Sequence, residues 1–189
     1  MAVRPVLLYP HPALKRRAAP VDLASERERV VSVVADLLDT VAAHPGCVGL
    51  AAPQIGEEVR VAVIDVSGHR KTTVCHGRLV LINPQVLESA GSEVAREGCL
   101  SIPKLTANVR RPTWISISYS TVAGERSFLD TEGFEARCIL HELDHLDGIL
   151  FLDRVESLAR DVFRRKTFAQ PQKGGAGPTS RYPDPAPEP

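Results

Sequence analysis

The stretch His141-Glu142-Leu143-Asp144-His145 constrains this chain more than any other, because it matches the HExxH pattern. Residues four apart on a helix share one face, with Cβ atoms about 5–6 Å apart, so two imidazoles at this spacing can converge on one metal ion. His141 and His145 are therefore candidate metal ligands. Glu142 lies about 100° around the helix from His141, where its carboxylate can serve as a general base without binding the ion. The alternative is a surface helix that carries two histidines by accident.

A third metal ligand must come from elsewhere, because catalytic transition-metal sites usually have three protein ligands and one open position. Asp147 and Asp153 lie close downstream, but the distal histidine or glutamate of the common metallopeptidases is missing from this region. Upstream, Cys99 follows a glycine and precedes a Ser-Ile-Pro turn, which places its sulfur well for binding as a thiolate.

The length, charge balance and composition of the chain indicate its class of protein. A chain of 189 residues fits one domain, and we predict a single catalytic domain over 1–168 followed by a disordered Pro/Gly-rich tail over 169–189. Basic and acidic residues balance at 23 each, so nothing draws the whole chain to nucleic acid or to anionic lipid. No apolar run approaches the ~20 residues that cross a bilayer. The four cysteines are scattered and no secretory leader precedes them, which favours a reducing cytoplasm.

The pattern of apolar residues predicts an α+β fold. A proline-rich arm over 4–22 should be extended and lie across other elements. A helix should begin at a capping box of Ser25 and Glu28 and end at His44-Pro45-Gly46. Strands are expected at 59–66 and 79–82 and as a hairpin of 114–119 with 125–129, followed by the HExxH helix from Gly133 to about Gly148 and a short basic helix over 155–168.

The segment 46–56 is rich in small residues, and it has two interpretations. Small residues let a backbone approach a ligand closely, or they form a tight turn into the next strand. Gln54 is the one side chain in this segment able to donate a directed hydrogen bond.

Three motifs together resemble the peptide deformylase family, in the family's order: CVGLAAPQ at 47–54, EGCLS at 97–101 and HELDHLDG at 141–148. The resemblance covers residues 6 to about 168. It implies the deformylase-like fold, with small antiparallel or mixed sheets around a central HExxH helix, an N-terminal helix and a C-terminal helix. It also implies removal of the N-formyl group from the formylmethionine of newly synthesised proteins, with release of formate.

The resemblance implies roles for single residues. Cys99, His141 and His145 would bind one divalent metal ion, and Glu142 would act as general acid and base. Gln54 and the backbone N–H of Leu100 would donate to the formyl oxygen, while Gly49 would offer a backbone contact to the substrate. His and Cys ligands suit Zn²⁺, Fe²⁺, Co²⁺ and Ni²⁺ alike, so Fe²⁺ is expected from the resemblance alone. The remaining candidate roles are an apolar methionine pocket of Val48, Phe134 and Cys138, and a supporting polar network of Glu97, Arg111 and Asp144.

The chain departs from the family pattern at Cys47, which replaces a glycine, at Leu140, often glutamine, and at Thr106, where some members have an arginine that contacts substrate. The position of Cys47 should tolerate a Cβ and place a reactive thiol near the cleft.

Two rival functions use the same residues. An HExxH metallopeptidase would cleave peptide bonds, and a silent metal-binding or ribosome-associated module would lack Glu142, Gln54 or a ligand, all of which are present. Expected partners are N-formylmethionyl nascent peptides and a transient ribosome contact near Arg164, Arg165 and Lys166. No membrane and no sequence-specific nucleic acid are expected as partners.

Overall fold

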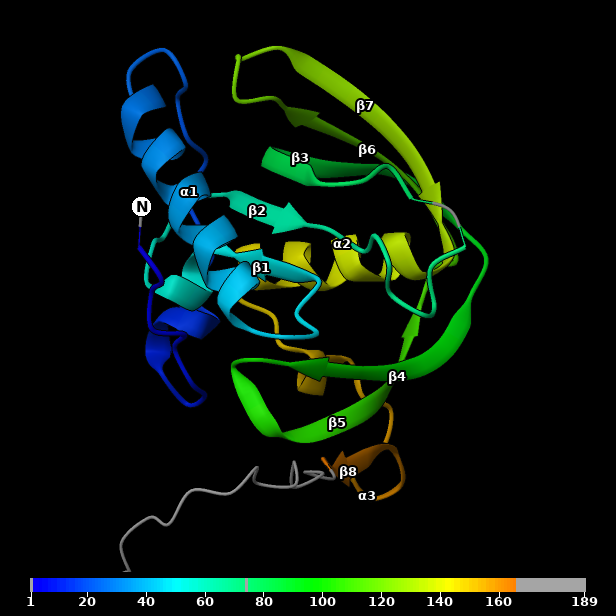
Figure 1. Cartoon of the computed structure of the whole chain (residues 1–189). Helices are drawn as coiled ribbons and strands as arrows, with labels where there is room; N and C mark the ends of the chain where they lie inside the picture. Colours follow the sequence, from blue (N-terminus) through cyan, green and yellow to red (C-terminus); the bar gives the residue numbers. More distant parts are fainter. Residues whose placement is uncertain (1, 74, 166–189) are drawn as a thin grey trace, which may run out of the picture.

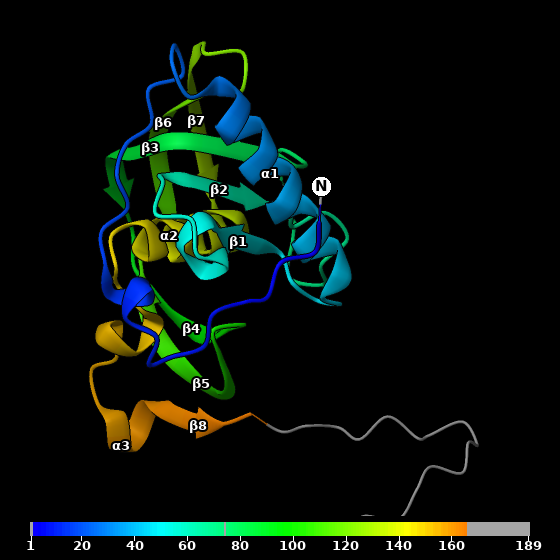
Figure 2. The same cartoon turned by 90° about the vertical axis from the view of Figure 1, so that its left-hand side faces the viewer.

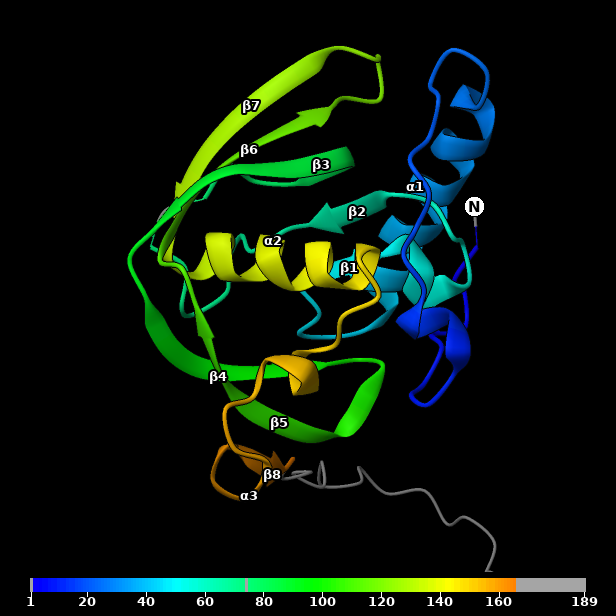
Figure 3. The same cartoon turned by 180° about the vertical axis from the view of Figure 1, so that it is seen from behind.

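Two antiparallel sheets enclose the HExxH helix in this computed structural model, which describes residues 2–73 and 75–165 (Figure 1). The larger sheet has the order β1-β2-β3-β6-β7 and the smaller has the order β4-β5-β8. Helix α2, Gly133–Leu146, runs between them, and α1, Arg27–Ala43, packs beside β1 and β2 (Figures 1 and 3). The strands are β1 Gly49–Ala51, β2 Val61–Ile64, β3 Leu79–Ala90, β4 Glu93–Cys99, β5 Ile102–Arg111, β6 Trp114–Ser120, β7 Arg126–Glu132 and β8 Val162–Arg164.

Strand β2 is buried on both faces, which explains its unbroken apolar sequence Val-Ala-Val-Ile. Successive strand residues point to opposite faces. Ala62 and Ile64 join the core that surrounds α2, whereas Val61 and Val63 join the core beneath α1. Strand β2 thus packs against α2 on one face and against α1 on the other.

The two faces of helix α2 differ in polarity, and the polar face carries the candidate site. Ala136, Ile139, Leu143 and Leu146 are buried in the core of the larger sheet. The polar side chains on its other face meet the smaller sheet, where Arg137 and His141 both contact Glu97 of β4. The helix ends before Gly148, whose φ is +71° and whose added Cβ would lie 2.7 Å from the Lys15 carbonyl oxygen. Only glycine fits there.

The N-terminal arm wraps the domain as an extended strap, as predicted (Figure 2). The Leu7 N–H donates to the Gln54 carbonyl at 2.7 Å, and the Tyr9 N–H donates to the Ser101 carbonyl at 2.9 Å. Further along, the Ala18 N–H donates to the Leu146 carbonyl at 2.8 Å. Apart from one turn of 3-10 helix at Pro12–Lys15, the arm forms no helix, and these backbone donors join it to all three motif segments.

Most predicted elements are present, with corrections to the start of the first helix and to the end of the strand that begins at Leu79. The helix of 27–43 is present, but Ser25 does not form a capping box; its hydroxyl donates to the Asp22 carboxylate at 2.8 Å. The strand predicted to end at 82 continues to Ala90 through an irregularity at Asn83, which has φ +50° and bonds to both backbone groups of Val21.

The basic helix predicted over 155–168 is wrong for most of its length. Leu158–Asp161 forms one helical turn, α3, and the chain then becomes strand β8 because Val162–Arg164 pairs with the edge of β5. The predicted domain boundary at 168 and the tail of 169–189 lie outside the described residues. Within 2–73 and 75–165, no helix is both long enough and apolar enough to cross a bilayer.

Candidate metal centre and active site

The three predicted ligands lie together although they are far apart in sequence. Cys99 is the last residue of β4, and His141 and His145 lie one turn apart on α2. Their donor atoms all lie within 4.8 Å of one another, with 3.2 Å between Cys99 Sγ and His145 Nε2. The alternative ligands lie elsewhere: Asp147 is 2.7 Å from Arg60, and Asp153 is 2.6 Å from Lys15.

The donor set fits a transition-metal ion. Glu97 accepts a hydrogen bond from Nδ1 of His141 at 2.9 Å, which orients the ring so that Nε2 is the nitrogen available to bind a metal ion. Burial raises the pKa of the Cys99 thiol, but the two imidazoles outweigh burial and hold that pKa well below its ordinary value. A buried thiolate beside two imidazoles is the donor set that binds Zn²⁺ or Fe²⁺ in proteins.

A buried ionic network orients the ligands. Glu97 accepts from Arg111 Nε at 2.6 Å, from Arg111 Nη2 at 3.0 Å and from Arg137 Nη1 at 2.9 Å, besides His141. Burial acts to raise the pKa of Glu97, but these donors prevail and lower it to about 2. Arg111 also donates to Asp144 at 2.8 Å, so the predicted network of Glu97, Arg111 and Asp144 is present.

Glu142 is buried against β1. An added Cβ on Gly49 would lie 2.7 Å from Glu142 Oε1, closer than real Cβ contacts, so glycine at position 49 gives the carboxylate its room. Glu142 Oε2 is buried and has no hydrogen-bond partner within the described residues. Burial raises the pKa of Glu142 to about 7, although His141 and His145 act to lower it. Such a group exchanges protons near neutral pH.

The Gln54 side chain has one defined orientation. Its Oε1 accepts from the Ala51 N–H at 2.9 Å, so the amide nitrogen must face the site. That nitrogen lies 3.4 Å from Cys99 Sγ and 3.2 Å from Ser101 Oγ.

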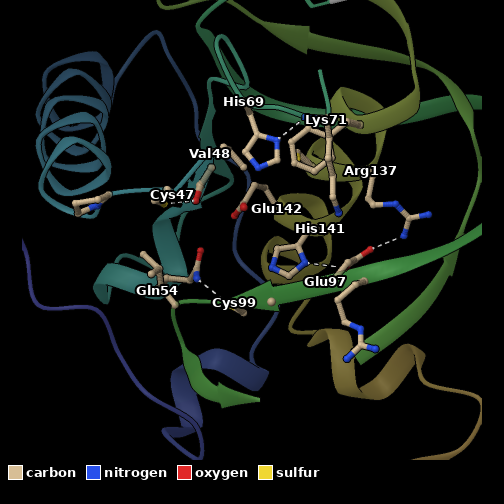
Figure 4. A pocket seen from close by; sticks show the side chains of 18 of the residues that line it. Cys47, Val48, Gln54, His69, Lys71, Glu97, Cys99, Arg137, His141 and Glu142 are labelled. Carbon is tan, nitrogen blue, oxygen red and sulfur yellow. Dashed lines mark hydrogen bonds and ion pairs between the residues drawn. The ribbon is translucent and has the colours of Figure 1, made fainter. Parts of the chain in front are cut away.

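One cavity of about 260 Å³ opens onto these groups (Figure 4). Val48, Phe134 and Cys138, predicted as the methionine pocket, all line it, and so do Gly49, Leu100, His141 and Glu142. The ring of His69 stacks on Phe134 with centroids 4.3 Å apart and adds a further wall. The sequence analysis missed His69 because it lies in a polar loop, 67–77, without periodicity.

Two further side chains of the site were missed. Arg137 contacts Glu97, and Arg154 donates to Asp144 at 2.6 Å. Arg137 lies four residues before His141, so helical spacing would have placed it on the ligand face. Nothing in the sequence marks Arg154.

The three residues that depart from the family pattern lie in different surroundings. Cys47 lines the cavity, as expected, and its thiol donates to the Gly49 carbonyl at 3.1 Å. The expectation of a reactive thiol is wrong, because burial raises the pKa of Cys47 to about 12 and so disfavours the thiolate. Thr106 accepts a hydrogen bond from Arg96. Leu140 lines a different hollow, beside Asp144 and Asp147.

Comparison with known proteins gives one consistent result. The family model described as polypeptide deformylase matches residues 3–161. The chain is 40% identical to a peptide deformylase of Mesorhizobium japonicum over 88% of the chain and 92% of the relative, and 36% identical to one of Desulfotalea psychrophila over 88% and 95%.

Solved structures agree. The peptide deformylase of Legionella pneumophila is 35% identical, with a TM-score of 0.74 over 84% of this chain and 89% of that one. A peptide deformylase of Acinetobacter baumannii with bound Met-Ala-Ser is 32% identical, with a TM-score of 0.75 over 82% and 100%.

Proposed function

The chain belongs to the polypeptide deformylase family and is a metal-dependent hydrolase that removes N-formyl groups from nascent peptides, and we propose that Cys99, His141 and His145 hold its metal ion. The convergence of these three donors beside Glu142 and Gln54 is the observation that carries the proposal. When bound, the ion would act as a Lewis acid toward the formyl oxygen and would acidify a water molecule.

Fe²⁺ is the proposed native metal. The ligand set itself also accepts Zn²⁺, Co²⁺ and Ni²⁺, so this choice depends on the family resemblance. Elemental analysis of protein purified without oxygen tests it, and zinc as the only bound metal would overturn it.

Glu142 is the proposed general base and acid. Its carboxylate takes a proton from the attacking water and later gives it to the nitrogen of the departing amine. Burial favours this role because it brings the pKa of Glu142 near neutrality, so the same group can accept and release a proton.

Gln54 and the Leu100 backbone are the proposed donors to the formyl oxygen as it gains negative charge. The bond from Ala51 to Gln54 Oε1 aims the Gln54 amide nitrogen before substrate arrives. Because this geometry is already set, little reorganisation remains to be made during the reaction.

Val48, Phe134 and Cys138 are the proposed walls of the methionine pocket, since all three line the cavity that opens onto Glu142. Gly49 would contact the peptide backbone. Gly49 lies in β1, which is an edge strand of the larger sheet and pairs with β2. Extended peptides commonly bind along such an edge. Binding of Met-Ala-Ser by the Acinetobacter baumannii relative supports a peptide in this site.

The cytoplasm is the proposed location, because nascent chains arise there. A transient ribosome contact is proposed at the basic end of the domain. Arg164 is exposed on β8, whereas Arg165 lines the cavity and Lys166 lies outside the described residues. Co-sedimentation with ribosomes that Arg164→Ala leaves unchanged would remove Arg164 from this contact. We also propose a single catalytic domain that ends near residue 168.

Formate release from formyl-Met-Ala-Ser by anaerobically metallated protein tests the proposal. Glu142→Gln should lower kcat at least 100-fold with unchanged metal content, whereas Glu88→Gln, an exposed side chain on β3, should have no effect. Two peptide fragments in place of formate and an intact chain would instead indicate a metallopeptidase.

A further inference from the structure

Besides Arg137, which pairs with Glu97, three cationic side chains line the cavity beside the proposed metal site. They are Lys71 from the loop after β2, Arg96 from β4, and Arg165 from the segment that follows β8. We call Lys71, Arg96 and Arg165 the cationic rim. All three residues are exposed. Figure 4 shows Lys71 above His141, and Lys71 Nζ lies 5.6 Å from the centre of the Phe134 ring.

The charge of the cationic rim is not compensated within the described part of the chain. No ion pair joins Lys71, Arg96 or Arg165 to any described carboxylate, whereas the exposed Arg16 and Arg110 both have one. Neither carboxylate that lines the cavity forms an ion pair with the cationic rim. Glu97 accepts hydrogen bonds from Arg111, Arg137 and His141, and Glu142 is buried against Gly49. The cavity therefore presents net positive charge at its rim.

Arg96 is held in place by neutral partners. Its Nη1 donates to Thr106 Oγ1 at 3.2 Å and its Nε donates to Asn108 Oδ1 at 3.1 Å. The guanidinium carbon lies 3.4 Å from the centre of the Phe163 ring. These contacts fix the plane of the guanidinium, but they leave its charge in full and its Nη2 unused by any hydrogen bond of the described residues.

Arg165 is fitted onto the strand that carries Cys99. Its Nη2 occupies the space that a Cβ on Gly98 would need, so glycine at position 98 makes room for the guanidinium. The Arg165 N–H donates to the Lys104 carbonyl at 2.8 Å, which continues the pairing of β8 with β5. The segment after β8 thus places the Arg165 guanidinium against Gly98, the residue before the proposed metal ligand Cys99.

We propose that the cationic rim selects formyl peptides that carry an acidic side chain on one of the two residues after formylmethionine. The inference rests on the proposed function, because a peptide with its formyl group at the metal site would lie in the cavity that Gly49 lines together with the cationic rim. A carboxylate there would pair with guanidinium groups that already have defined positions, so little ordering entropy opposes the pair.

Amide-capped peptides test the preference. The substrates are formyl-Met-Ala-Glu-amide and formyl-Met-Glu-Ala-amide, each with its Gln and Lys counterparts. We expect kcat/KM for the better Glu peptide to exceed that for its Gln counterpart about tenfold at low salt, or about 1.4 kcal/mol. The Lys peptide should be poorer than the Gln peptide, and 0.5 M NaCl should remove most of the difference.

Variants assign the effect to the rim. Arg96→Gln and Arg165→Gln should each reduce the Glu-over-Gln ratio about threefold, and Arg165→Lys should restore part of it. Arg160→Gln, an exposed arginine of α3 that does not line the cavity, should leave the ratio unchanged. Thermal melting of each variant verifies that the fold is retained.

A second readout is independent of turnover. Fluorescently labelled Glu and Gln peptides should bind the Glu142→Gln protein with the same difference in Kd.

Formate released equally from Glu and Gln peptides would overturn the inference while leaving the proposed function intact. Formate from none of the peptides would overturn both. A preference confined to free-acid peptides would show that the rim reads a terminal carboxylate, and it would also overturn the inference.

Discussion

Replacement of Glu97 by glutamine tests the buried network most directly. Glu97 is 7% exposed and accepts four hydrogen bonds, from two nitrogens of Arg111, from Arg137 and from His141. Glu97→Gln keeps the shape of the side chain but leaves two buried guanidinium groups short of negative charge. Breaking a buried ion pair by removing one partner typically costs about 3–5 kcal/mol of unfolding free energy.

The pH dependence gives a second, independent magnitude. The pKa of Glu97 lies at about 2 in the folded chain, against an ordinary value of 4.5. Because the folded pKa is depressed, the carboxylate stabilises the fold above pH 4.5, and this stabilisation is lost as the pH falls toward 2. The difference corresponds to about 3 kcal/mol at pH 7, of which about 2 kcal/mol is lost by pH 3.

Urea unfolding of metal-free protein at pH 7 and at pH 3 measures both quantities. The free energy of unfolding of Glu97→Gln should be lower than that of the wild type by about 3–5 kcal/mol at pH 7, and the gap should shrink by about 2 kcal/mol at pH 3. Glu156→Gln is the matched control, because Glu156 pairs with Arg110 on the surface at 2.7 Å and should change stability by less than about 1 kcal/mol. A gap below 1 kcal/mol at pH 7, or one that is equal at both pH values, would refute the reasoning.

Three other predictions concern the cavity. Gly49→Ala should displace Glu142 and lower kcat about 100-fold with unchanged metal content, as measured by formate release and elemental analysis; an unchanged kcat would contradict the packing of Glu142 on Gly49. The kcat/KM should rise with pH through the pKa of Glu142, because the base form is the active one. Burial brings that pKa to about 7 and a bound cation lowers it, so the half-maximal point should lie below pH 7, and a flat profile from pH 4.5 to 8 with metal retained would exclude this base. The Cys47 thiol, whose pKa burial raises to about 12, should react with iodoacetamide more slowly at pH 8 than a free thiol does, as followed by mass spectrometry of its peptide; modification as fast as that of free cysteine would show that the thiol is not buried.

Patterns local in the sequence were reliable guides. The HExxH spacing placed two imidazoles on one face of a helix, and helical periodicity placed α1 over residues 27–43. Both depend on contacts between neighbours within one element, which the chain carries wherever that element lies. The third ligand needed the resemblance, since spacing alone left Cys99, Asp147 and Asp153 open.

Predictions failed where a distant partner decided the outcome. Residues 162–164 form a strand because the edge of β5 lies beside them, although their sequence alone favoured a continued helix. The strand of 79–90 continues past Asn83 because Val21 of the N-terminal arm satisfies the Asn83 side chain.

The sequence by itself determined the HExxH helix, which carries two imidazoles on one face and a carboxylate beside them, because this follows from residue identity and from spacing within one element. Only the tertiary structure decided that Cys99 meets the two histidines, that Gly49 makes room for Glu142, and that Arg165 returns to the cavity from the end of the domain. Those positions depend on how sheets and helices pack, and packing joins residues between which the sequence shows no pattern.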